Sequence, residues 1–395
     1  MRPDVIVVGL GAAGSATLYH LARRGAAALG IDRHRPPHDQ GSSHGETRVT
    51  RQAIGEGDDY VPLALRSHEL WREIEVESGE TLMLTTGCLI IGHPEAPGAH
   101  TGKPDFLRHT LAAAARHGIP HEVMTAAVAA ERFPQFSLRG DEVAYFEPGG
   151  GVLFPERCIG AQLSLAQRDG ATVRTDECVE RVLPVEGGVR VVTDQGAYEA
   201  AQVVVAAGAW SPSLLGGPYS RALRIYRQAM HWFEPADPAA FSPDRFPVFM
   251  WMHGAGPEDW FYGVPVVPGS RGVKVSMERF GADASTPHQV DRTATRDEAL
   301  AMHARHVAGR LEGLGAAWLR SAACLYTMAP KSRFLIGRDA DFERMIVVSA
   351  CSGHGFKHSP AIGEAVARLA LEGGQPAVLA PFEPGAALTR RLTAT

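Results

Sequence analysis

With 395 residues, the chain is too long for one ordinary core, so two domains are expected. A formal net charge of −5 and 21% charged residues leave no basic surplus for a phosphate backbone, so no nucleic-acid partner is expected. No uninterrupted apolar run reaches the ~18 residues of a transmembrane helix, so no membrane partner is expected either.

The N-terminal apolar stretch is broken by three glycines and lacks a signal-peptide cleavage pattern, so a cytoplasmic location is expected. The chain has an odd number of cysteines without a C-x-x-C pair, at Cys88, Cys158, Cys178, Cys324 and Cys351. Neither a disulfide framework nor a metal site is indicated.

An apolar run at residues 5–8 leads directly into the pattern G-x-G-x-x-G, formed by Gly9, Gly11 and Gly14. These glycines allow a tight strand-to-helix turn, close approach of backbone N–H groups to a pyrophosphate, and close packing of the helix on the sheet. Asp32 follows at the end of the next apolar run, where a carboxylate accepts hydrogen bonds from ribose hydroxyls. This order of strand, glycine turn, helix and acidic residue predicts a dinucleotide-binding βαβ unit. Either FAD or NAD could be the bound dinucleotide.

The next segments alternate between a long loop and predicted helices. Residues 26–32 form the predicted second strand, and residues 33–59, rich in Gly, Pro, His and Ser, are predicted to be a loop. A helix with Pro62 in its first turn should follow. Further predicted helices cover residues 107–117 and 298–311, each ending at or near a glycine.

The remaining pattern predicts strands and one final helix. Short β-branched runs predict strands at residues 189–193, 203–206, 228–233, 273–276 and 345–350. A glycine-rich turn follows the last strand, and the final helix begins at Pro360.

Two arginines, Arg48 and Arg51, stand three residues apart in the loop after Asp32. At that spacing they can lie on one side of a turn or short helix and face one site, where guanidinium groups suit a carboxylate. The alternative is a pair of solvated surface arginines.

No second G-x-G-x-x-G pattern occurs in the chain. Many flavin enzymes that exchange electrons with NAD(P)H or a disulfide need a second nucleotide site or a C-x-x-C pair. The simpler interpretation is one cofactor that the substrate reduces directly.

Several longer motifs resemble one family of flavin enzymes. Residues 36–67 contain P-P-H-x-x-G-S-x-H-G-x-T-R-x-x-R-x-A-x-G-E-G, and F-E-P, A-G-A-W, A-C-L-Y-T and S-G-H-G-F-K follow at residues 146, 207, 323 and 352. These motifs span nearly the whole chain. The sequence resembles the monomeric sarcosine oxidase and N-methyltryptophan oxidase group, flavin amine oxidases related to D-amino-acid oxidase.

The resemblance implies an α/β (α+β) fold with a Rossmann-like FAD-binding domain interleaved with a mixed-sheet substrate domain. The first domain would comprise residues 1–85, 152–220 and 324–395, and the second residues 86–151 and 221–323. The implied reaction is oxidation of a secondary α-amino acid, N-methyl or cyclic, by hydride transfer to flavin N5. Water would hydrolyse the imine, O₂ would be reduced to H₂O₂, and the enzyme would be a monomer.

The resemblance also implies a set of FAD-binding positions. Cys324 matches a cysteine that forms a thioether to the flavin, although a buried apolar cysteine is the common alternative. The other implied cofactor-binding residues are Gly9, Gly11, Gly14, Asp32, Ser42, Ser43, Val179, Gly353, Gly355 and Lys357.

The implied catalytic and substrate-binding residues come from separate motifs. Lys274 would lie beside flavin N5 and promote the reaction with O₂, although period-2 alternation alone is consistent with a solvent-facing lysine. Arg51 and Lys357 would hold the substrate carboxylate, with Tyr326 and Glu278 also binding substrate. The implied catalytic set is completed by Arg48, His44 and Tyr262.

The chain departs from the family pattern around the substrate. Gln52 stands in place of His, Ile54 in place of Tyr, and Glu278 in place of the His of sarcosine enzymes. The exact substrate is therefore open. The tryptophans of the predicted substrate domain, Trp232, Trp251 and Trp260, fit either a pocket wall or a core.

Two further functions remain open at this point. One is a flavin dehydrogenase that uses an acceptor other than O₂, and the other is a non-catalytic or NAD-binding Rossmann protein.

Overall fold

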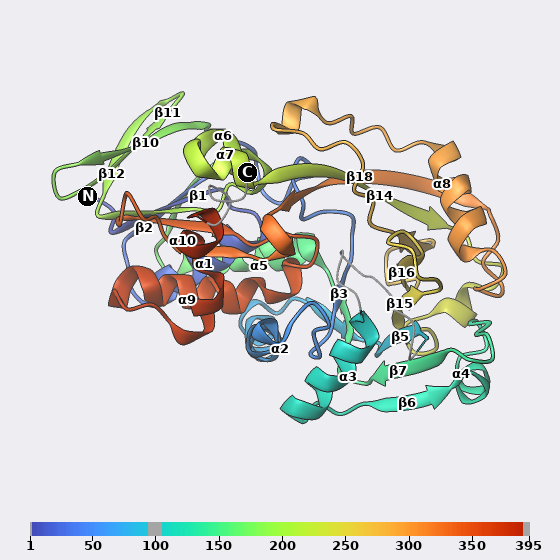
Figure 1. Ribbon diagram of the computed structural model, residues 1–395. Helices are drawn as coiled ribbons and strands as arrows, with labels where there is room; N and C mark the ends of the chain where they lie inside the picture. The colour runs from blue at the N-terminus through green and yellow to red at the C-terminus, as the bar shows by residue number, and fades with distance from the viewer. Residues whose placement is uncertain (1, 94–104, 390–395) are drawn as a thin grey trace.

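The computed structural model describes residues 2–93 and 105–389, which form four sheets with helices packed around them (Figure 1). The first sheet has the strand order β19-β20-β13-β1-β2-β9. All neighbours in it are parallel except β19, which is antiparallel to β20. The bounds are Val5–Val8 (β1), Ala28–Ile31 (β2), Thr172–Arg174 (β9), Gln202–Val205 (β13), Leu335–Arg338 (β19) and Met345–Ser349 (β20).

Both faces of this sheet are covered, which explains why β1 and β13 are continuous apolar runs. Val5 and Val7 pack into the cluster that contains the helices, whereas Ile6 and Val8 pack against Val189 of a three-stranded sheet on the other face. The covering elements are α1 (Ala12–Arg23), α2 (Val61–Ser78), α5 (Pro155–Arg168), α9 (Ser359–Glu372), β10 (Val179–Val185), β11 (Gly188–Thr193) and β12 (Gly196–Ala200).

The second large sheet has eight strands in the order β18-β14-β17-β16-β15-β5-β7-β6 and lies on the right in Figure 1. Only β15 and β5 pair in parallel within this sheet, so it is mixed. The bounds are Cys88–Gly92 (β5), Glu122–Thr125 (β6), Val143–Glu147 (β7), Arg224–Phe233 (β14), Val248–Met252 (β15), Trp260–Val264 (β16), Val273–Ser276 (β17) and Trp318–Met328 (β18). The predicted α/β fold with a Rossmann-like unit and a mixed sheet is confirmed.

A small sheet connects the two halves. Its strands are β3 (Arg48–Thr50), β8 (Gly151–Leu153) and β4 (Met83–Thr85), and β3 contacts the short 3₁₀ helix η7 (Phe356–His358). The other helices are α3 (Phe106–His117), α4 (Ala126–Arg132), α6 (Ser211–Leu215), α7 (Gly217–Ala222), α8 (Arg296–Met302) and α10 (Pro384–Thr389).

Most predicted elements are present, and two need correction. The predicted loop over residues 33–59 contains β3 and the start of a 3₁₀ turn at Asp58–Tyr60. The predicted helix over residues 298–311 is wrong in its second half, because α8 begins at Arg296 and continues only as a π-helical turn, His303–Val307.

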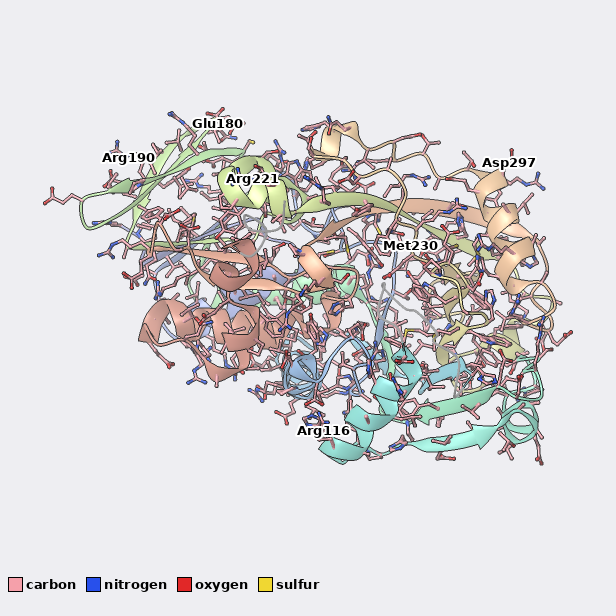
Figure 2. The ribbon with its side chains drawn as sticks, viewed as in Figure 1. Arg116, Glu180, Arg190, Arg221, Met230 and Asp297 are labelled. Carbon is pink, nitrogen blue, oxygen red and sulfur yellow. The ribbon has the colours of Figure 1, made fainter. Side chains whose placement is uncertain are left out.

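The two domain assignments stay a prediction, and β18 crosses the predicted boundary at residues 323/324 as one continuous strand. Charged side chains such as Arg116, Arg190 and Asp297 are exposed at the periphery, whereas Met230 of β14 is buried (Figure 2). Within residues 2–93 and 105–389, no helix is long and apolar enough to cross a membrane.

Candidate active site

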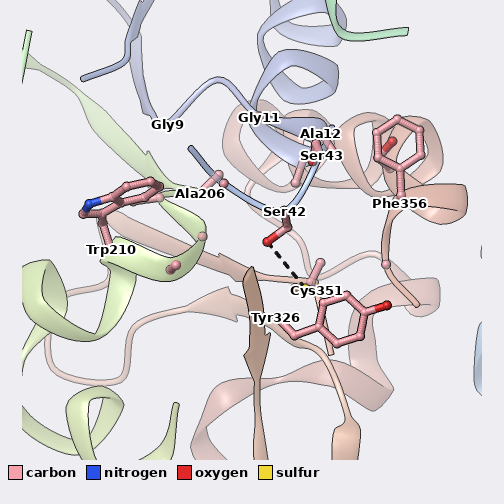
Figure 3. A pocket seen from close by; sticks show the side chains of 18 of the residues that line it. Gly9, Gly11, Ala12, Ser42, Ser43, Ala206, Trp210, Tyr326, Cys351 and Phe356 are labelled. Atoms are coloured by element: carbon pink, nitrogen blue, oxygen red, sulfur yellow. Dashed lines mark hydrogen bonds between the residues drawn. The ribbon is translucent and has the colours of Figure 1, made fainter. Parts of the chain in front are cut away.

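One cavity of about 460 Å³ extends from the glycine turn after β1 to a group of charged side chains beside the mixed sheet. Figure 3 shows Gly9 and Gly11 at one side of this cavity, with Ser42, Cys351 and Tyr326 further along it. The Rossmann-like unit and the mixed sheet both contribute to its wall.

The glycine turn is built for close backbone packing. Gly9 has a φ of +85°, and a Cβ on Gly14 would lie 1.7 Å from the Gly9 carbonyl oxygen. A Cβ on Gly11 would meet nothing within 4 Å, and no side chain caps the N-terminus of α1. This leaves open, positively polarised space for a pyrophosphate.

Asp32 lines the same end of the cavity and is held by the backbone. Its carboxylate accepts hydrogen bonds from the backbone N–H of Leu10 at 2.7 Å and of His34 at 2.9 Å. Val179, at the start of β10, also lines this end. The residues predicted to bind the adenosine part of a cofactor are therefore brought together.

The middle of the cavity is formed by two loops. Ser42 donates a hydrogen bond to the Leu325 carbonyl, and Ser43 and Gly353 line the wall beside it. A Cβ on Gly355 would lie 1.5 Å from the Ala350 carbonyl oxygen, so only glycine fits this turn.

Lys274 is buried, so the solvent-facing interpretation is wrong. Its strand, β17, lies between β14 and β16, and Lys274 Nζ donates hydrogen bonds to the carbonyls of Gly45 at 3.1 Å and Thr47 at 2.6 Å. Burial, followed by the charge of Arg48, lowers the pKa of Lys274 well below its usual value. Lys274 is not itself among the residues that line the cavity.

Arg48 lines the cavity, and His44 lies close to it in the fold. Arg48 lies at the start of β3, not in a turn or short helix, and donates hydrogen bonds to the Ser42 and Thr47 carbonyls. His44 is buried behind the wall, and its burial, together with the charge of Arg48, lowers its pKa to about 4. His44 is therefore neutral at pH 7.

Arg51 and Lys357 lie at the far end of the cavity, and both are buried. Arg51 Nη2 is 2.5 Å from a carboxylate oxygen of Glu56, and Lys357 Nζ is 3.9 Å from the other oxygen. Burial lowers the pKa of Lys357 to about 8, although the charge of Glu56 opposes the shift. The buried Nε of Arg51 has no hydrogen-bond partner among the described residues.

A second carboxylate positions the segment after Arg51. Glu147, in the predicted F-E-P motif, accepts hydrogen bonds from the backbone N–H of Gln52 at 2.6 Å and of Ala53 at 3.0 Å. The hydroxyl of Tyr145 donates a third, at 3.0 Å. The Arg51 Nη1 group in turn donates to the Ala53 carbonyl, so Glu147 helps to fix the guanidinium.

The cavity wall near Arg51 and Lys357 also includes four other side chains, those of Glu278, Tyr326, Tyr262 and Trp260. Burial raises the pKa values of both tyrosines, so they stay neutral. The sequence was consistent with tryptophans in either a pocket wall or a core, and both occur. Trp260 lines the cavity, whereas Trp251 packs in the core of the mixed sheet.

Cys324 lies on β18 and is only 2% exposed, in a cluster with Met230 and Trp232. Cys351 is partly exposed and lines the cavity, with its Sγ 3.8 Å from Ser42 Oγ. Burial raises the pKa of the Cys324 thiol, and the charge of Arg48 opposes the shift. All five cysteines are free, and no group of three or more His, Cys, Asp or Glu in the described ranges is placed to bind a metal.

Three site carboxylates and one thiol were not predicted as site residues: Glu56, Glu147, Glu156 and Cys351. Glu156 accepts hydrogen bonds from the backbone N–H of Gly45 and Glu46, at 2.7 and 3.1 Å, and so holds the loop that bears His44. Two of these residues lie inside motifs that were noted, G-E-G and F-E-P. An acidic residue inside a glycine-rich or proline-bounded motif was therefore the sequence signal that could have identified Glu56 and Glu147 as site residues.

The fold and the cavity define a protein that binds a dinucleotide beside a charged, largely buried substrate pocket. The model of the family described as "FAD dependent oxidoreductase" matches residues 4–369. The chain belongs to this family, in the group of monomeric sarcosine oxidase and N-methyl-L-tryptophan oxidase.

Known relatives cover almost the whole chain. It is 38% identical to monomeric sarcosine oxidase of Streptomyces avermitilis, over 99% of this chain and 98% of that protein. It is 32% identical to N-methyl-L-tryptophan oxidase of Yersinia pestis, over 97% and 98%. The solved structure of NikD, an unusual amino acid oxidase essential for nikkomycin biosynthesis, superposes with a TM-score of 0.82 at 25% identity, covering 97% of both chains.

Proposed function

We propose that this FAD-dependent oxidoreductase oxidises a secondary α-amino acid, N-methyl or cyclic, at the carbon next to nitrogen, with O₂ as electron acceptor. The observation that carries the proposal is the pair of buried cations, Arg51 and Lys357, at the end of a cavity that begins at the dinucleotide turn. Two cations in a poorly hydrated pocket hold a carboxylate far better than either does in water.

The cofactor site suits FAD. Gly9, Gly11, Gly14 and Asp32 would hold the pyrophosphate and ribose, and further contacts would come from Ser42, Ser43, Val179, Gly353, Gly355 and Lys357. When bound, FAD supplies a hydride acceptor and passes the electrons to O₂, which yields H₂O₂. Cys324 is proposed to bind the cofactor covalently.

The protein would orient the substrate from several sides. Arg51 and Lys357 would bind its carboxylate, while Tyr326 and Glu278 would contact the remaining polar group. His44, Arg48, Tyr262 and Lys274 are proposed as the catalytic set around the cofactor ring. The amine must be neutral when it reacts, because its lone pair drives loss of the hydride.

The relatives support this choice of substrate class. The two relatives compared above are named for sarcosine and N-methyl-L-tryptophan, which are both N-methyl amino acids. The name of the first also supports a monomer. A cytoplasmic location is part of the same proposal.

A substrate panel tests the function directly. Purified protein should be yellow and should release H₂O₂ with at least one of sarcosine, N-methyltryptophan, proline and pipecolate, measured with a peroxidase-coupled dye. Substrate-dependent bleaching without peroxide would indicate a dehydrogenase. No bleaching with any of these amino acids would contradict the proposal.

Arg51→Lys should raise KM about 10²-fold with a smaller loss of kcat, because lysine keeps the charge but loses the planar, bidentate geometry. Initial-rate kinetics with the best panel substrate give both constants. Arg344→Lys, at an exposed position, is the matched control and should leave both unchanged. An unchanged KM in Arg51→Lys would exclude Arg51 from carboxylate binding.

A further inference from the structure

Glu278 lies two residues after the end of β17, the strand that bears Lys274 and Ser276. The side chain of Gln228, on the neighbouring β14, holds the segment after the strand. Its amide donates to the Arg279 carbonyl at 2.8 Å, and its oxygen accepts from the Arg279 N–H at 2.9 Å. Two hydrogen bonds therefore hold the backbone of Arg279, the residue that follows Glu278.

Glu278 is only 3% exposed as a residue, and it lines the cavity. The hydroxyl of Tyr326 hydrogen-bonds to the Glu278 carboxyl group, but the buried Oε2 atom has no hydrogen-bond partner among the described residues. Buried polar atoms are almost always paired, so an unpaired oxygen on a cavity wall indicates that a ligand supplies the partner.

The position of Glu278 identifies which part of the ligand this is. Its charged neighbours are Lys357 and Glu56, the groups around the proposed carboxylate site. The nitrogen of an α-amino acid lies one carbon away from its carboxylate. A substrate whose carboxylate is bound by Lys357 and Arg51 therefore has its amino group, and not a distant side-chain group, nearest to Glu278.

We propose that Glu278 Oε2 accepts the proton of the substrate ammonium group, an inference that rests on the proposed function. The N–H bond breaks, its electron pair stays on nitrogen as the lone pair, and an O–H bond forms on Glu278. The substrate thus binds as the abundant zwitterion and becomes the reactive neutral amine inside the pocket. Glu278 is then a catalytic residue.

The surroundings raise the affinity of the Glu278 carboxylate for a proton, and the group accepts one from the substrate above its own pKa. Burial, with the charge of Glu56, raises the pKa of Glu278 well above its usual value, and Lys357 opposes the shift. The other titratable groups that face it are Tyr326 and Cys324 on β18 and Tyr262 on β16. All three have raised pKa values, so they are neutral at pH 7.

The Glu278→Gln variant tests the assignment, because the amide has the same shape but accepts no proton. At a pH just above the pKa of Glu278, the kcat/KM of this variant should be lower than that of the wild type by about 10²-fold or more. The wild-type kcat/KM should reach a plateau above the pKa of Glu278. In Glu278→Gln it should rise tenfold per pH unit up to the pKa of the free substrate amine, since only the neutral amine can react.

Binding of propionate, a carboxylate without nitrogen, provides a readout besides activity. Its dissociation constant, followed by the change in the flavin spectrum, should be the same within about threefold in both proteins. If Glu278→Gln does not bind the cofactor, the Glu278→Asp variant is used instead. A shift of the acidic limb of its kcat/KM profile relative to that of the wild type then supports the assignment, and an unshifted limb contradicts it.

The outcomes separate the two proposals. If the wild type oxidises no secondary amino acid, the proposed function fails. If the wild type is active and the pH profiles of the wild type and the Glu278 variant coincide, only the assignment of Glu278 fails. A parallel loss of propionate binding would show that Glu278 is structural, and it would also overturn the assignment.

Discussion

Lys274→Met is expected to slow the reaction of the reduced enzyme with O₂ by about 10²–10³-fold, the typical effect of removing one preorganised charge from a site where charge develops. The first electron given to O₂ produces superoxide, an anion. Lys274 is buried, and burial with the charge of Arg48 lowers its pKa, so a neighbouring anion would stabilise its charged form. The ammonium group of Lys274 and the superoxide anion would therefore stabilise each other.

Stopped-flow spectroscopy separates this step from substrate oxidation. Anaerobic reduction by substrate should change less than about tenfold in Lys274→Met. Removal of the ammonium leaves the Thr47 carbonyl paired with Arg48, so the local fold is expected to persist. Lys331→Met, at an exposed lysine, is the control. Unchanged reoxidation in Lys274→Met would exclude the role.

Cys324→Ser should abolish covalent attachment of the cofactor. After acid precipitation, wild-type protein should keep its yellow colour in the pellet, whereas the variant should release all of it to the supernatant. Thiolate is the attacking form of cysteine; burial raises the pKa of the Cys324 thiol, and the nearby charge of Arg48 acts in the opposite direction. Absorbance and the mass of the intact chain give two independent measurements.

Cys351→Ser is the matched control, because Cys351 lines the cavity and its Sγ lies 3.8 Å from Ser42 Oγ. Its pellet should remain yellow. If Cys351→Ser instead releases the colour while Cys324→Ser retains it, the attachment point is Cys351. If wild-type protein releases all of its flavin, the cofactor is not covalently bound.

The sequence was most informative where backbone geometry decides the structure. Gly9 and Gly14 occupy positions that exclude a Cβ, and such positions leave a readable pattern of glycines. The buried strands around β1 were equally clear, because both faces of the sheet are covered and the strands are continuously apolar. The family resemblance also singled out Arg51, Tyr326 and Lys357, which line the cavity.

Side chains whose role depends on distant partners could not be placed from sequence. The alternation of side chains along residues 273–276 predicted on which face of the strand Lys274 lies, but not what covers that face. Their strand, β17, lies inside the mixed sheet, and both of its faces are buried. Glu56 and Glu156 act on atoms brought close only by the tertiary fold. The helix over residues 298–311 failed because a π-helical turn interrupts a suitable apolar pattern.

The contact of Glu56 with Arg51 and its approach to Lys357 have a thermodynamic consequence for selectivity. Glu56 already serves as a counter-ion to both cations, so an acid that binds there as proposed would displace this internal carboxylate and gain only the difference between the two interactions. Simple cellular anions gain little from such an exchange. An amino acid with a second point of attachment would gain more, so plain carboxylic acids such as propionate are expected to bind more weakly than the substrate.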